Sequence, residues 1–263
     1  MKKSWSGERL ETFVFNSITI EHLHRYGIVL SYIENKIVLD IACGEGYGSN
    51  LLSSKATQVI GVDIDLDTIE EARKKYNASN LTFILGSTDK IPVKNSYVDV
   101  VISFETIEHH DKHEEMMNEI KRVLKPDGIL IISSPEKTGE ISSNPFHIKE
   151  LSKKEFTNLI GKYFKYHKIY SQKIVHGSLI TSEKGNNTTF EYQSGDFEKI
   201  TTYKEMPNNV YNICIANDKF EISLPSSFFD GNDILLQNIL HPYINSRPYR
   251  LINFIKKLLF FWR

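Results

Sequence analysis

The sequence predicts a doubly wound α/β fold, in which helices cover both faces of a mostly parallel sheet. Three observations lead to this prediction. Short, near-continuous apolar runs rich in β-branched residues alternate with helical patterns from Lys36 onward, which is typical of strands buried on both faces. Capping residues and stop signals separate these elements. The 263 residues, 40% of them hydrophobic and 25% charged, have the composition of a globular protein with a sizeable core.

Seven runs of the chain are expected to be strands. Five of them alternate with helical stretches, and two more come later in the chain. Their residues are 36–42, 57–63, 81–86, 97–104 and 128–134, followed by 164–175 and 210–217.

Three helices are predicted from their first residues. Asp67, Asp111 and Ser152 are each followed three residues later by a glutamate, which is the spacing of a capping box. Apolar residues at helical spacing follow Asp111, and the residues Lys-Pro-Asp-Gly at 125–128 stop that helix before the next strand. Gly161 is expected to end the helix that Ser152 opens.

The length of the chain is better explained by one elaborated domain than by two. Residues 1–35 are expected to form a helical lead-in, and residues 36–217 the domain itself. Within it, residues 176–209 are rich in Gly, Asn, Thr and Ser, and we expect an insertion or lid there. Residues 218–263 form a C-terminal extension.

The charge balance argues against a dedicated nucleic-acid binder. The chain has 32 Lys and Arg against 33 Asp and Glu, a formal net charge of −1, whereas such proteins usually carry a basic excess. Two cysteines are too few for a disulfide framework and fit a reducing compartment. The first residues lack the apolar segment of a signal peptide, and no apolar run approaches the ~20 residues of a membrane span. We therefore expect a cytoplasmic protein.

A glycine-rich loop follows the first predicted strand and opens a helix. Gly44 and Gly46, with Ala42 before them, let the backbone approach a ligand closely, and the helix N-terminus behind them favours polar or anionic groups. The next strand ends at Asp63, whose carboxylate can accept hydrogen bonds from ribose hydroxyls. This combination occurs with two ligand classes: dinucleotides, and adenosyl compounds that carry a methionine moiety.

Two residues favour the second ligand class. The dinucleotide pattern G-x-G-x-x-G ends here in Ser49 instead of glycine. Asp40, just before the loop, would repel an anionic pyrophosphate, but it suits the cationic amino group of a methionine moiety.

On these motifs the chain resembles class I S-adenosylmethionine-dependent methyltransferases, across residues 36–217. The resemblance implies a Rossmann-like mixed sheet of about seven strands with an antiparallel last strand. It also implies S-adenosyl-L-methionine as the cofactor, covered by residues 1–35. The cofactor-binding residues that it implies are Asp40, Ala42, Gly44, Gly46, Asp63, Ile64, Ser87, Thr88, Ser103 and Phe104, with Arg25 on the cofactor carboxylate. Ala42 stands where the family usually has its first glycine, and Ser87 where it often has aspartate.

Three segments are similar to a branch found among bacterial glycan-biosynthesis methyltransferases: EHLHRY (21–26), SFETIEHH (103–110) and NPFHIKELSKKEF (144–156). This similarity implies O-methylation of a saccharide or nucleotide-sugar precursor of a surface polysaccharide such as a capsule. The ETIEH stretch is also similar to ubiquinone-type O-methyltransferases. Three alternatives therefore stay open: a quinone-type or other small-molecule O- or N-methyltransferase, methylation of a phosphate-linked group on an activated sugar, and a non-catalytic cofactor-binding scaffold.

Transfer to a hydroxyl requires a base, and histidine suits this role because its pKa of ~6.5 lies near neutrality. His109, just beyond the fourth strand, is the first candidate. Glu105 precedes it by four residues, so on a helix it could orient the imidazole. His147, in the loop after the fifth strand, is the second candidate base. Glu108, and Asn144 beside His147, are expected to hold the acceptor.

The run of histidines at 109–113 is not expected to bind a metal. His109 and His113 have the i, i+4 spacing of a ligand pair, but Asp111 between them is expected to cap a helix and so interrupt a continuous face.

The C-terminal segment 247–263 combines Arg and Lys with Phe and Trp, and its apolar run is too short to span a bilayer. Such a segment fits an interfacial helix on the anionic inner face of a membrane. The alternative is a terminal helix docked on the core or on a second subunit. The sequence leaves this choice and the oligomeric state open.

Overall fold

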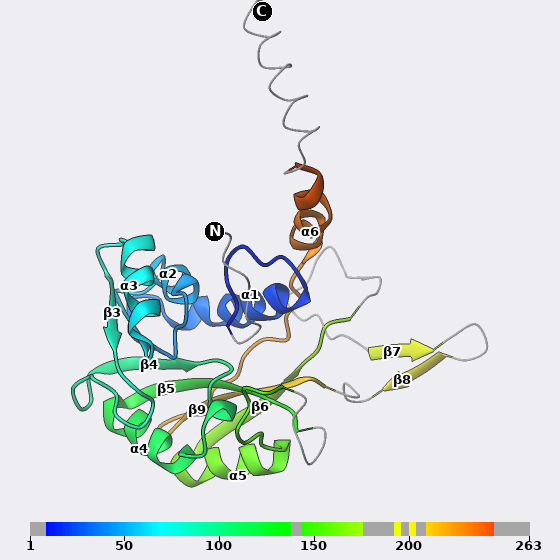
Figure 1. The fold of residues 1–263 in the computed structure, drawn as a ribbon. Coiled ribbons are helices and arrows are strands. Elements are labelled where there is room, and N and C mark those ends of the chain that lie inside the picture. Colours follow the sequence, from blue (N-terminus) through cyan, green and yellow to red (C-terminus); the bar gives the residue numbers. More distant parts are fainter. Residues whose placement is uncertain (1–8, 138–143, 176–191, 196–199, 204–208, 245–263) are drawn as a thin grey trace, which may run out of the picture.

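A seven-stranded sheet forms the centre of the molecule. The computed structural model describes residues 9–137, 144–175, 192–195, 200–203 and 209–244 (Figure 1). The strands of the sheet lie in the order β3-β2-β1-β4-β5-β9-β6. They are β1 (Ile37–Ile41), β2 (Gln58–Asp63), β3 (Leu81–Leu85), β4 (Val98–Ser103), β5 (Leu124–Pro135), β6 (Tyr166–Gln172) and β9 (Tyr211–Asn217).

The direction of the strands confirms the predicted fold class. Strands β1 to β5 pair in parallel, whereas β9 pairs antiparallel with both β5 and β6. The chain leaves β1 toward β2 and β3 on one side and returns through β4 and β5 on the other. Because the strand order reverses between β1 and β4, a crevice is expected at the carboxyl ends of these strands.

Helices cover the sheet on both faces, as Figure 1 shows. One face carries the first three helices, of which the first two bury Tyr26, Val29 and Leu52 against the sheet. The other face carries α4 and α5, which bury Met116 and Phe156. The helices are α1 (Ser17–Val29), α2 (Tyr47–Ser53), α3 (Leu66–Lys75), α4 (His113–Val123), α5 (Lys153–Tyr163) and α6 (Asn232–Ile244), with 3-10 turns η1 (Leu30–Tyr32) and η2 (Ile107–His109).

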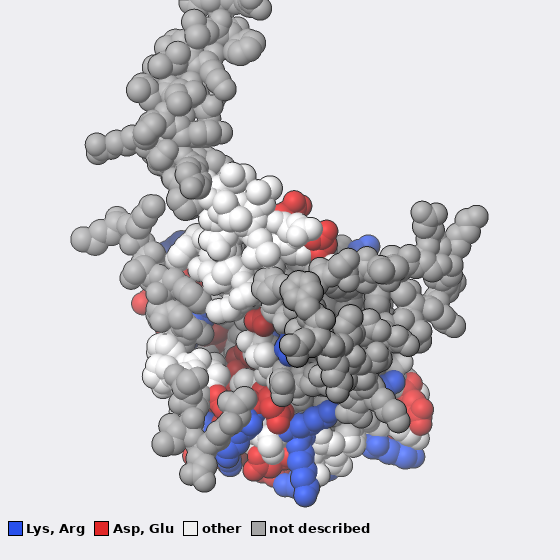
Figure 2. Space-filling view, turned by 90° about the vertical axis from the view of Figure 1, so that its right-hand side faces the viewer, with Lys and Arg blue, Asp and Glu red and all other residues white. Residues whose placement is uncertain are grey.

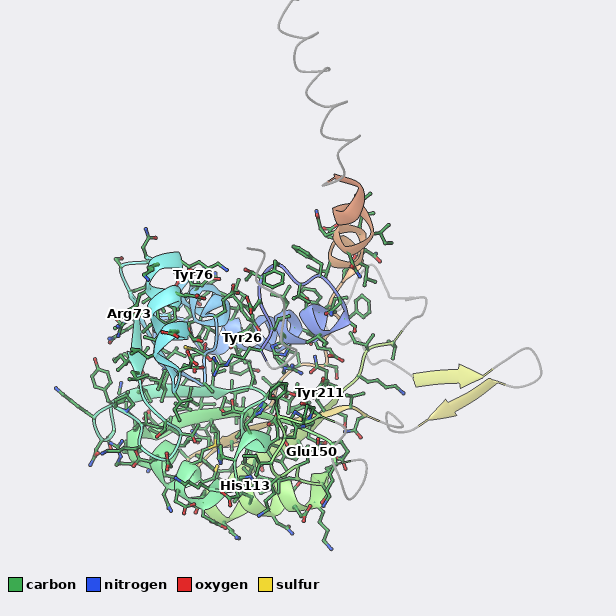
Figure 3. The ribbon with its side chains drawn as sticks, viewed as in Figure 1. Tyr26, Arg73, Tyr76, His113, Glu150 and Tyr211 are labelled. Atoms are coloured by element: carbon green, nitrogen blue, oxygen red, sulfur yellow. The ribbon has the colours of Figure 1, made fainter. Side chains whose placement is uncertain are left out.

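Figure 3 shows the two faces through single side chains. Tyr26 lies between α1 and the sheet, whereas His113 lies on the α4 side. Both side chains are buried. Apolar strands with cover on both faces are what the near-continuous hydrophobic runs predicted.

The helix caps agree with the sequence at one site and differ at two. Ser152 forms the predicted capping box with Glu155. However, α3 is capped by Asp65, which accepts from the Thr68 N–H, because the chain enters the helix two residues earlier than Asp67. Helix α4 begins at His113 without a side-chain cap, so the prediction for Asp111 is wrong.

Gly161 does not end α5, which continues to Tyr163. The helix continues because Phe164, just beyond its end, is buried in the core. A Cβ at Gly161 would lie 3.2 Å from Cε1 of His167, so this glycine permits close packing of α5 on β6.

Part of the predicted insertion at 176–209 is a hairpin. Strands β7 (Tyr192–Gly195) and β8 (Ile200–Tyr203) pair antiparallel in a separate two-stranded sheet. The other residues between 176 and 208 lie outside the described part of the chain. The roles predicted for the insertion and the lead-in stay predictions.

The chain after β9 returns across α1. The Tyr32 hydroxyl donates to the Ser223 carbonyl (2.6 Å), and His24 Nε2 lies 2.7 Å from the Ser227 hydroxyl. Helix α6 follows and contains no Lys or Arg. Figure 2 shows a largely uncharged surface over this helix, with most Lys and Arg of that view at the opposite end of the molecule.

The basic segment 247–263 lies outside the described residues, so both of its predicted placements stay predictions. Among the helices of the described residues, none combines the length and the apolarity that crossing a membrane requires.

The packing of α2 against α1 generates a first prediction. A Cβ at Gly48 would overlap the ring of Tyr26. Although alanine is the better helix former, by ~1 kcal/mol, we expect Gly48→Ala to lower the free energy of unfolding by about 1–3 kcal/mol because of overpacking. Chemical denaturation measures this change.

Gly27→Ala is the matched control. No atom lies within 4 Å of a Cβ added at Gly27, which also sits in a helix. We expect this substitution to raise the free energy of unfolding by about 0.5–1 kcal/mol. Equal effects of the two substitutions would contradict the described contact between Gly48 and Tyr26.

Candidate active site

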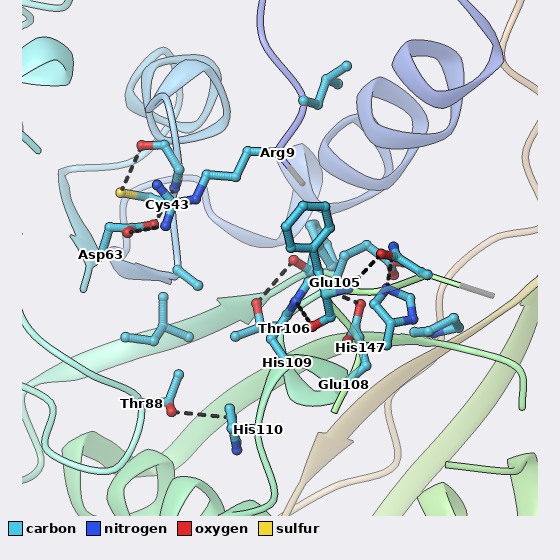
Figure 4. Close-up of a pocket in the computed structure, with 18 of the residues that line it drawn as sticks. Arg9, Cys43, Asp63, Thr88, Glu105, Thr106, Glu108, His109, His110 and His147 are labelled. Carbon is cyan, nitrogen blue, oxygen red and sulfur yellow. Dashed lines mark hydrogen bonds and ion pairs between the residues drawn. The ribbon is translucent and has the colours of Figure 1, made fainter. Parts of the chain in front are cut away.

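A cavity of about 1130 Å³ opens at the carboxyl ends of the parallel strands (Figure 4). One end is lined by the loops after β1, β2 and β3, and includes Cys43 and Asp63. The other end is lined by the turn after β4 and the loop after β5, and includes His109 and His147. The crevice expected from the strand order is therefore present, and it has two chemically different ends.

The glycine loop makes a left-handed turn out of β1. Ala42, Gly44 and Gly46 all have positive φ, at 59°, 53° and 87°. A Cβ at Gly46 would lie 2.7 Å from the Phe83 ring, so only glycine fits there. Over Gly44 the space is open, since its nearest neighbour is Cδ of Arg9 at 4.0 Å. The loop thus presents backbone to the cavity, as a cofactor cradle requires.

Asp63 lies at the end of β2, directly beside this loop. Its Oδ2 accepts from the Gly44 N–H (2.9 Å), and its Oδ1 accepts from the Asp65 N–H (3.0 Å). Each carboxylate oxygen keeps a second lone pair for a ligand hydroxyl. Arg9 lies 3.5 Å from Oδ1 and also lines the cavity. Sequence reasoning missed Arg9, because a single arginine in the lead-in carries no motif.

Asp40 is buried below the loop and is absent from the described lining of the cavity. Its carboxyl accepts from the Ser49 hydroxyl (2.6 Å) and from the Tyr26 hydroxyl (3.2 Å). Burial raises the pKa of Asp40 to about 7, although both hydrogen bonds act in the opposite direction. Asp40 therefore ties β1 to Tyr26 and to the helix behind the loop, and its predicted contact with a cofactor amino group stays a prediction.

The cavity brings together seven of the predicted cofactor residues: Ala42, Gly44, Asp63, Ile64, Ser87, Thr88 and Phe104. Ser103 is fully buried at the end of β4, and Gly46 lies behind the loop against Phe83. Thr88 lies 3.3 Å from Nε2 of His110, and the Ser87 hydroxyl donates to Asp89 (2.5 Å). The cofactor-binding roles of these residues stay predictions.

Arg25 is buried in the sheet wall and does not line the cavity. Its Nη1 donates to Gln172 (2.7 Å) and lies 3.9 Å from Oε1 of Glu105, and its guanidinium stacks 4.7 Å from the ring centre of Tyr211. These contacts replace the predicted contact with a cofactor carboxylate, because α1 turns Arg25 toward the sheet.

Glu105 follows β4 in a strained conformation, with φ of 52°. Its backbone N–H donates to the Ser133 hydroxyl (3.0 Å), which in turn donates to its carboxylate (2.6 Å). The side chain therefore faces Ser133 and Arg25. Positive φ in a residue with a side chain is costly and is concentrated at functional sites.

His109 is oriented by a carbonyl and not by Glu105. Its Nδ1 lies 3.0 Å from the Phe146 carbonyl oxygen, so Nδ1 carries the proton. The predicted role of Glu105 as the orienting group is wrong, because residues 105–109 form a turn and a 3-10 helix instead of a continuous α-helix.

His147 comes from the loop after β5 and lies against His109, with ring centres 5.2 Å apart. The Asn144 side-chain amide lies 2.9 Å from Nε2 of His147, and Oε1 of Glu150 lies 2.5 Å from Nδ1. Glu150 stands three residues after His147, a spacing that sequence reasoning passed over. The structure thus brings together both candidate bases and Asn144.

Glu108 lies beside the two histidines with 1% of its surface exposed. Burial, with the nearby charge of Glu105, raises the pKa of Glu108 well above its ordinary value. Its backbone carbonyl accepts from the N–H groups of Ile148 and Lys149 (2.8 and 3.1 Å). These bonds tie the loop after β5 to the turn after β4 and bring His147 to His109.

Residues 39–132 match the family model of a methyltransferase domain. A probable S-adenosylmethionine-dependent methyltransferase from Mycolicibacterium smegmatis is 35% identical over 128 residues, which is 47% of this chain and 49% of that protein. Residues 39–132 are a class I S-adenosylmethionine-dependent methyltransferase domain. The cofactor of this domain type is S-adenosylmethionine, and the open backbone over Gly44 with the carboxylate of Asp63 fits it.

Two further relatives of this methyltransferase domain have more specific names. A fatty-acid O-methyltransferase from Mycolicibacterium smegmatis is 28% identical over 120 residues, covering 42% of this chain and 44% of that protein. A phthiotriol/phenolphthiotriol dimycocerosates methyltransferase from Mycobacterium ulcerans is 25% identical over 126 residues, covering 46% of each. The chain spans about half the length of the curated relatives that it matches.

Solved structures resemble the methyltransferase fold over a larger part of the chain. A SAM-dependent methyltransferase from Thermotoga maritima has a TM-score of 0.54 at 18% identity and covers 77% of this chain and 93% of its own. The PH0226 protein from Pyrococcus horikoshii has a TM-score of 0.52 at 23% identity and covers 78% of this chain and 92% of its own. These likenesses support the fold of the sheet beyond residue 132.

The buried carboxyl of Asp40 generates a pH prediction. Its pKa of about 7 in the folded protein exceeds the ~3.9 of an unfolded aspartate. Because the folded state binds the proton more tightly, this carboxyl lowers stability as pH rises from about 4 to about 7. We therefore expect the free energy of unfolding of the wild type, relative to Asp40→Asn, to be lower at pH 8 than at pH 5.

Denaturation midpoints of both proteins at the two pH values measure this difference. Asp89→Asn is the control, because the hydrogen bond from Lys112 lowers the pKa of Asp89 to about 2. The Asp89 carboxylate contributes fully to stability at any pH above the pKa of an unfolded aspartate. The free energies of unfolding of wild type and Asp89→Asn should therefore differ equally at pH 5 and pH 8. If wild type and Asp40→Asn also differed equally at pH 5 and pH 8, this would contradict the raised pKa of Asp40.

Proposed function

We propose that this protein transfers the methyl group of S-adenosylmethionine to an oxygen atom of a small-molecule acceptor. The observation that carries the proposal is that the glycine loop and Asp63 line the same cavity as His109 and His147. S-adenosylmethionine supplies an activated methyl group. The protein then has to align the acceptor, exclude water and remove a proton.

The chain has residues for each of these tasks. The backbone at Ala42 to Glu45 and the carboxylate of Asp63 hold the cofactor, and Ile64, Ser87 and Thr88 flank its adenine. Phe104 packs edge-on against Tyr26, with ring centres 5.2 Å apart, and forms an apolar wall that excludes water where the two ends of the cavity meet.

His109 is placed to take the proton of an acceptor hydroxyl. Because Nδ1 donates to the Phe146 carbonyl, the lone pair of the neutral ring is on Nε2. His109 lines the cavity and is partly exposed, so Nε2 can reach a bound hydroxyl. His147 is the second candidate, and Glu108 and Asn144 position the acceptor.

An apolar body is the acceptor feature that the cavity supports best. Phe146, Ile148 and Val210 line its acceptor end and are exposed, Ile148 by 69%. Exposed apolar side chains at the rim of a pocket indicate an apolar ligand. We therefore propose a lipid-like acceptor, such as a fatty acid or a long-chain alcohol, consistent with the relative named a fatty-acid O-methyltransferase.

A saccharide or nucleotide-sugar precursor of a surface glycan is the second candidate. Polar side chains at the same end of the cavity, including Glu136, Asn144 and Asn209, favour a ligand with several hydroxyls. The relatives named above give the glycan assignment no support. Incubation of the full chain with labelled S-adenosylmethionine and either fatty acids or nucleotide sugars distinguishes the two classes.

Labelled product from the fatty acids or long-chain alcohols, with none from the nucleotide sugars, is the expected result. The reverse result would overturn the lipid assignment. Turnover of neither class by a chain that binds the cofactor would favour the non-catalytic scaffold.

Asp63 gives a test of the cofactor end. Loss of its charged hydrogen bonds costs about 1.5–3 kcal/mol each, so Asp63→Asn should weaken binding of S-adenosylhomocysteine by about tenfold or more. Calorimetry measures this affinity. Asp67→Ala, an exposed change in the first turn of α3, should leave it unchanged. Unaltered binding by Asp63→Asn would sink the proposed cofactor site.

His109 gives a test of the acceptor end. With an acceptor in hand, His109→Gln should lower kcat by about 10²–10⁴-fold, the range of general-base catalysis. Binding of S-adenosylhomocysteine should stay unchanged, which shows that the variant is folded. His24→Gln, a change outside the cavity, is the control for kcat. An undiminished kcat for His109→Gln would remove this residue from the mechanism.

A further inference from the structure

Three side chains with metal-ligand chemistry meet at the acceptor end of the cavity. Glu108, His109 and His147 each offer one ligand atom, and these atoms lie within 4.8 Å of one another. Figure 4 shows the three side chains grouped beside Glu105 and Thr106. The backbone bonds from Ile148 and Lys149 to the Glu108 carbonyl hold the two segments that carry them together.

The carboxylate of Glu108 is an unusual group to find buried. Within the described part of the chain, neither of its oxygens has a hydrogen-bond partner, and each is shielded from solvent. Nε2 of His109 lies 3.9 Å from its Oε1. A buried carboxylate without hydrogen bonds is strongly unfavourable unless a cation or a proton compensates it. The buried, unpartnered carboxylate of Glu108 therefore indicates a ligand, and it does so independently of the clustering of the three side chains.

Each imidazole is held through its Nδ1 atom. The Phe146 carbonyl accepts from Nδ1 of His109, and the Glu150 carboxylate accepts from Nδ1 of His147. In both neutral rings the lone pair is then on Nε2. Histidines that bind metals almost always donate the other ring N–H to a carbonyl or carboxylate in this way. A cation at His147 would replace the hydrogen bond from the Asn144 amide to Nε2.

We propose that Glu108, His109 and His147 bind one divalent transition-metal cation, of which Zn²⁺ is the best fit. Two imidazole nitrogens and one carboxylate favour zinc and its neighbours over magnesium or calcium, which prefer oxygen ligands. Three protein ligands also leave a coordination position open, as in catalytic zinc sites. All three residues line the cavity, so that position faces the acceptor.

The catalytic consequence rests on the proposed function. A bound cation lowers the pKa of a hydroxyl at its open position and stabilises the resulting oxygen anion. The acceptor hydroxyl would then lose its proton to solvent in the open cavity, and its oxygen would form a bond to the methyl carbon as the sulfur–methyl bond breaks, leaving S-adenosylhomocysteine. In this state His109 is a metal ligand and not the base.

Calorimetric titration of the full chain with ZnCl₂, after treatment with a chelator, tests the site. We expect one cation per chain. Glu108→Gln and His109→Gln should each weaken binding by more than about 100-fold, since changes to the groups that merely orient metal ligands already cost 10–100-fold. Glu150→Gln, which changes such an orienting group, should weaken zinc binding by about 10–100-fold. His110→Gln, in the same run of histidines, is the matched control and should bind zinc as the wild type does.

Two further measurements keep the outcomes distinct. Binding of S-adenosylhomocysteine by each variant shows that it is folded, and the visible absorption of bound Co²⁺ reports whether the ligand set changes in Glu108→Gln. Absence of zinc binding in a chain that binds S-adenosylhomocysteine overturns the metal site and leaves His109 as the base. Equal zinc binding by wild type and Glu108→Gln shows an adventitious site and overturns it as well. Zinc binding without any cofactor binding supports the metal site while the proposed function fails.

Discussion

The fold around the cavity depends on one buried carboxyl group, that of Asp40. It belongs to β1, and it accepts hydrogen bonds from Tyr26 of the lead-in helix and from Ser49 of the helix behind the glycine loop. The strand, the lead-in helix and the helix behind the glycine loop are therefore joined at this carboxyl group. Tyr26 also packs edge-on against Phe104 and Tyr47, and because all three line the cavity, the same contact fixes part of its wall.

The acceptor end is distinguished by an excess of acidic groups over cations. Glu21, Glu105 and Glu108 lie around Arg25, and burial raises the pKa of Glu21 and of Glu108. Arg25 contacts Glu105 and Gln172, whereas within the described residues the carboxylate of Glu108 has no hydrogen-bond partner. Such a site favours a ligand that brings positive charge or several hydrogen-bond donors. This electrostatic preference links the proposed transfer to a hydroxyl with the proposed cation.

Much of the fold could be predicted because its signals are local. Buried parallel strands produce continuous apolar runs, and the glycine loop with Asp63 lies within a short stretch of sequence. The predicted ends of helices were wrong where tertiary packing decides where a helix begins or ends. The burial of Phe164 carries α5 past Gly161, and the early entry of the chain into α3 moves its cap to Asp65.

The candidate site was harder to predict, since its residues are joined across the fold. The sequence identified His109 and His147, but not that backbone bonds from Ile148 and Lys149 to Glu108 bring them together. The orientation of Arg25 toward Tyr211 depends on how α1 sits on the sheet, which residue spacing does not specify. The strained backbone at Glu105 likewise has no signature in the sequence.

The bonds between the turn after β4 and the loop after β5 have an evolutionary consequence. The residues proposed to hold the cofactor follow β1, β2 and β3, whereas those proposed to surround the acceptor come from two connections that are bonded to each other. The acceptor end can therefore be remodelled as a unit, by exchange of these paired connections, while the glycine loop and Asp63 stay intact. In such a fold, related proteins can evolve different acceptor specificities while the site for the methyl donor is kept.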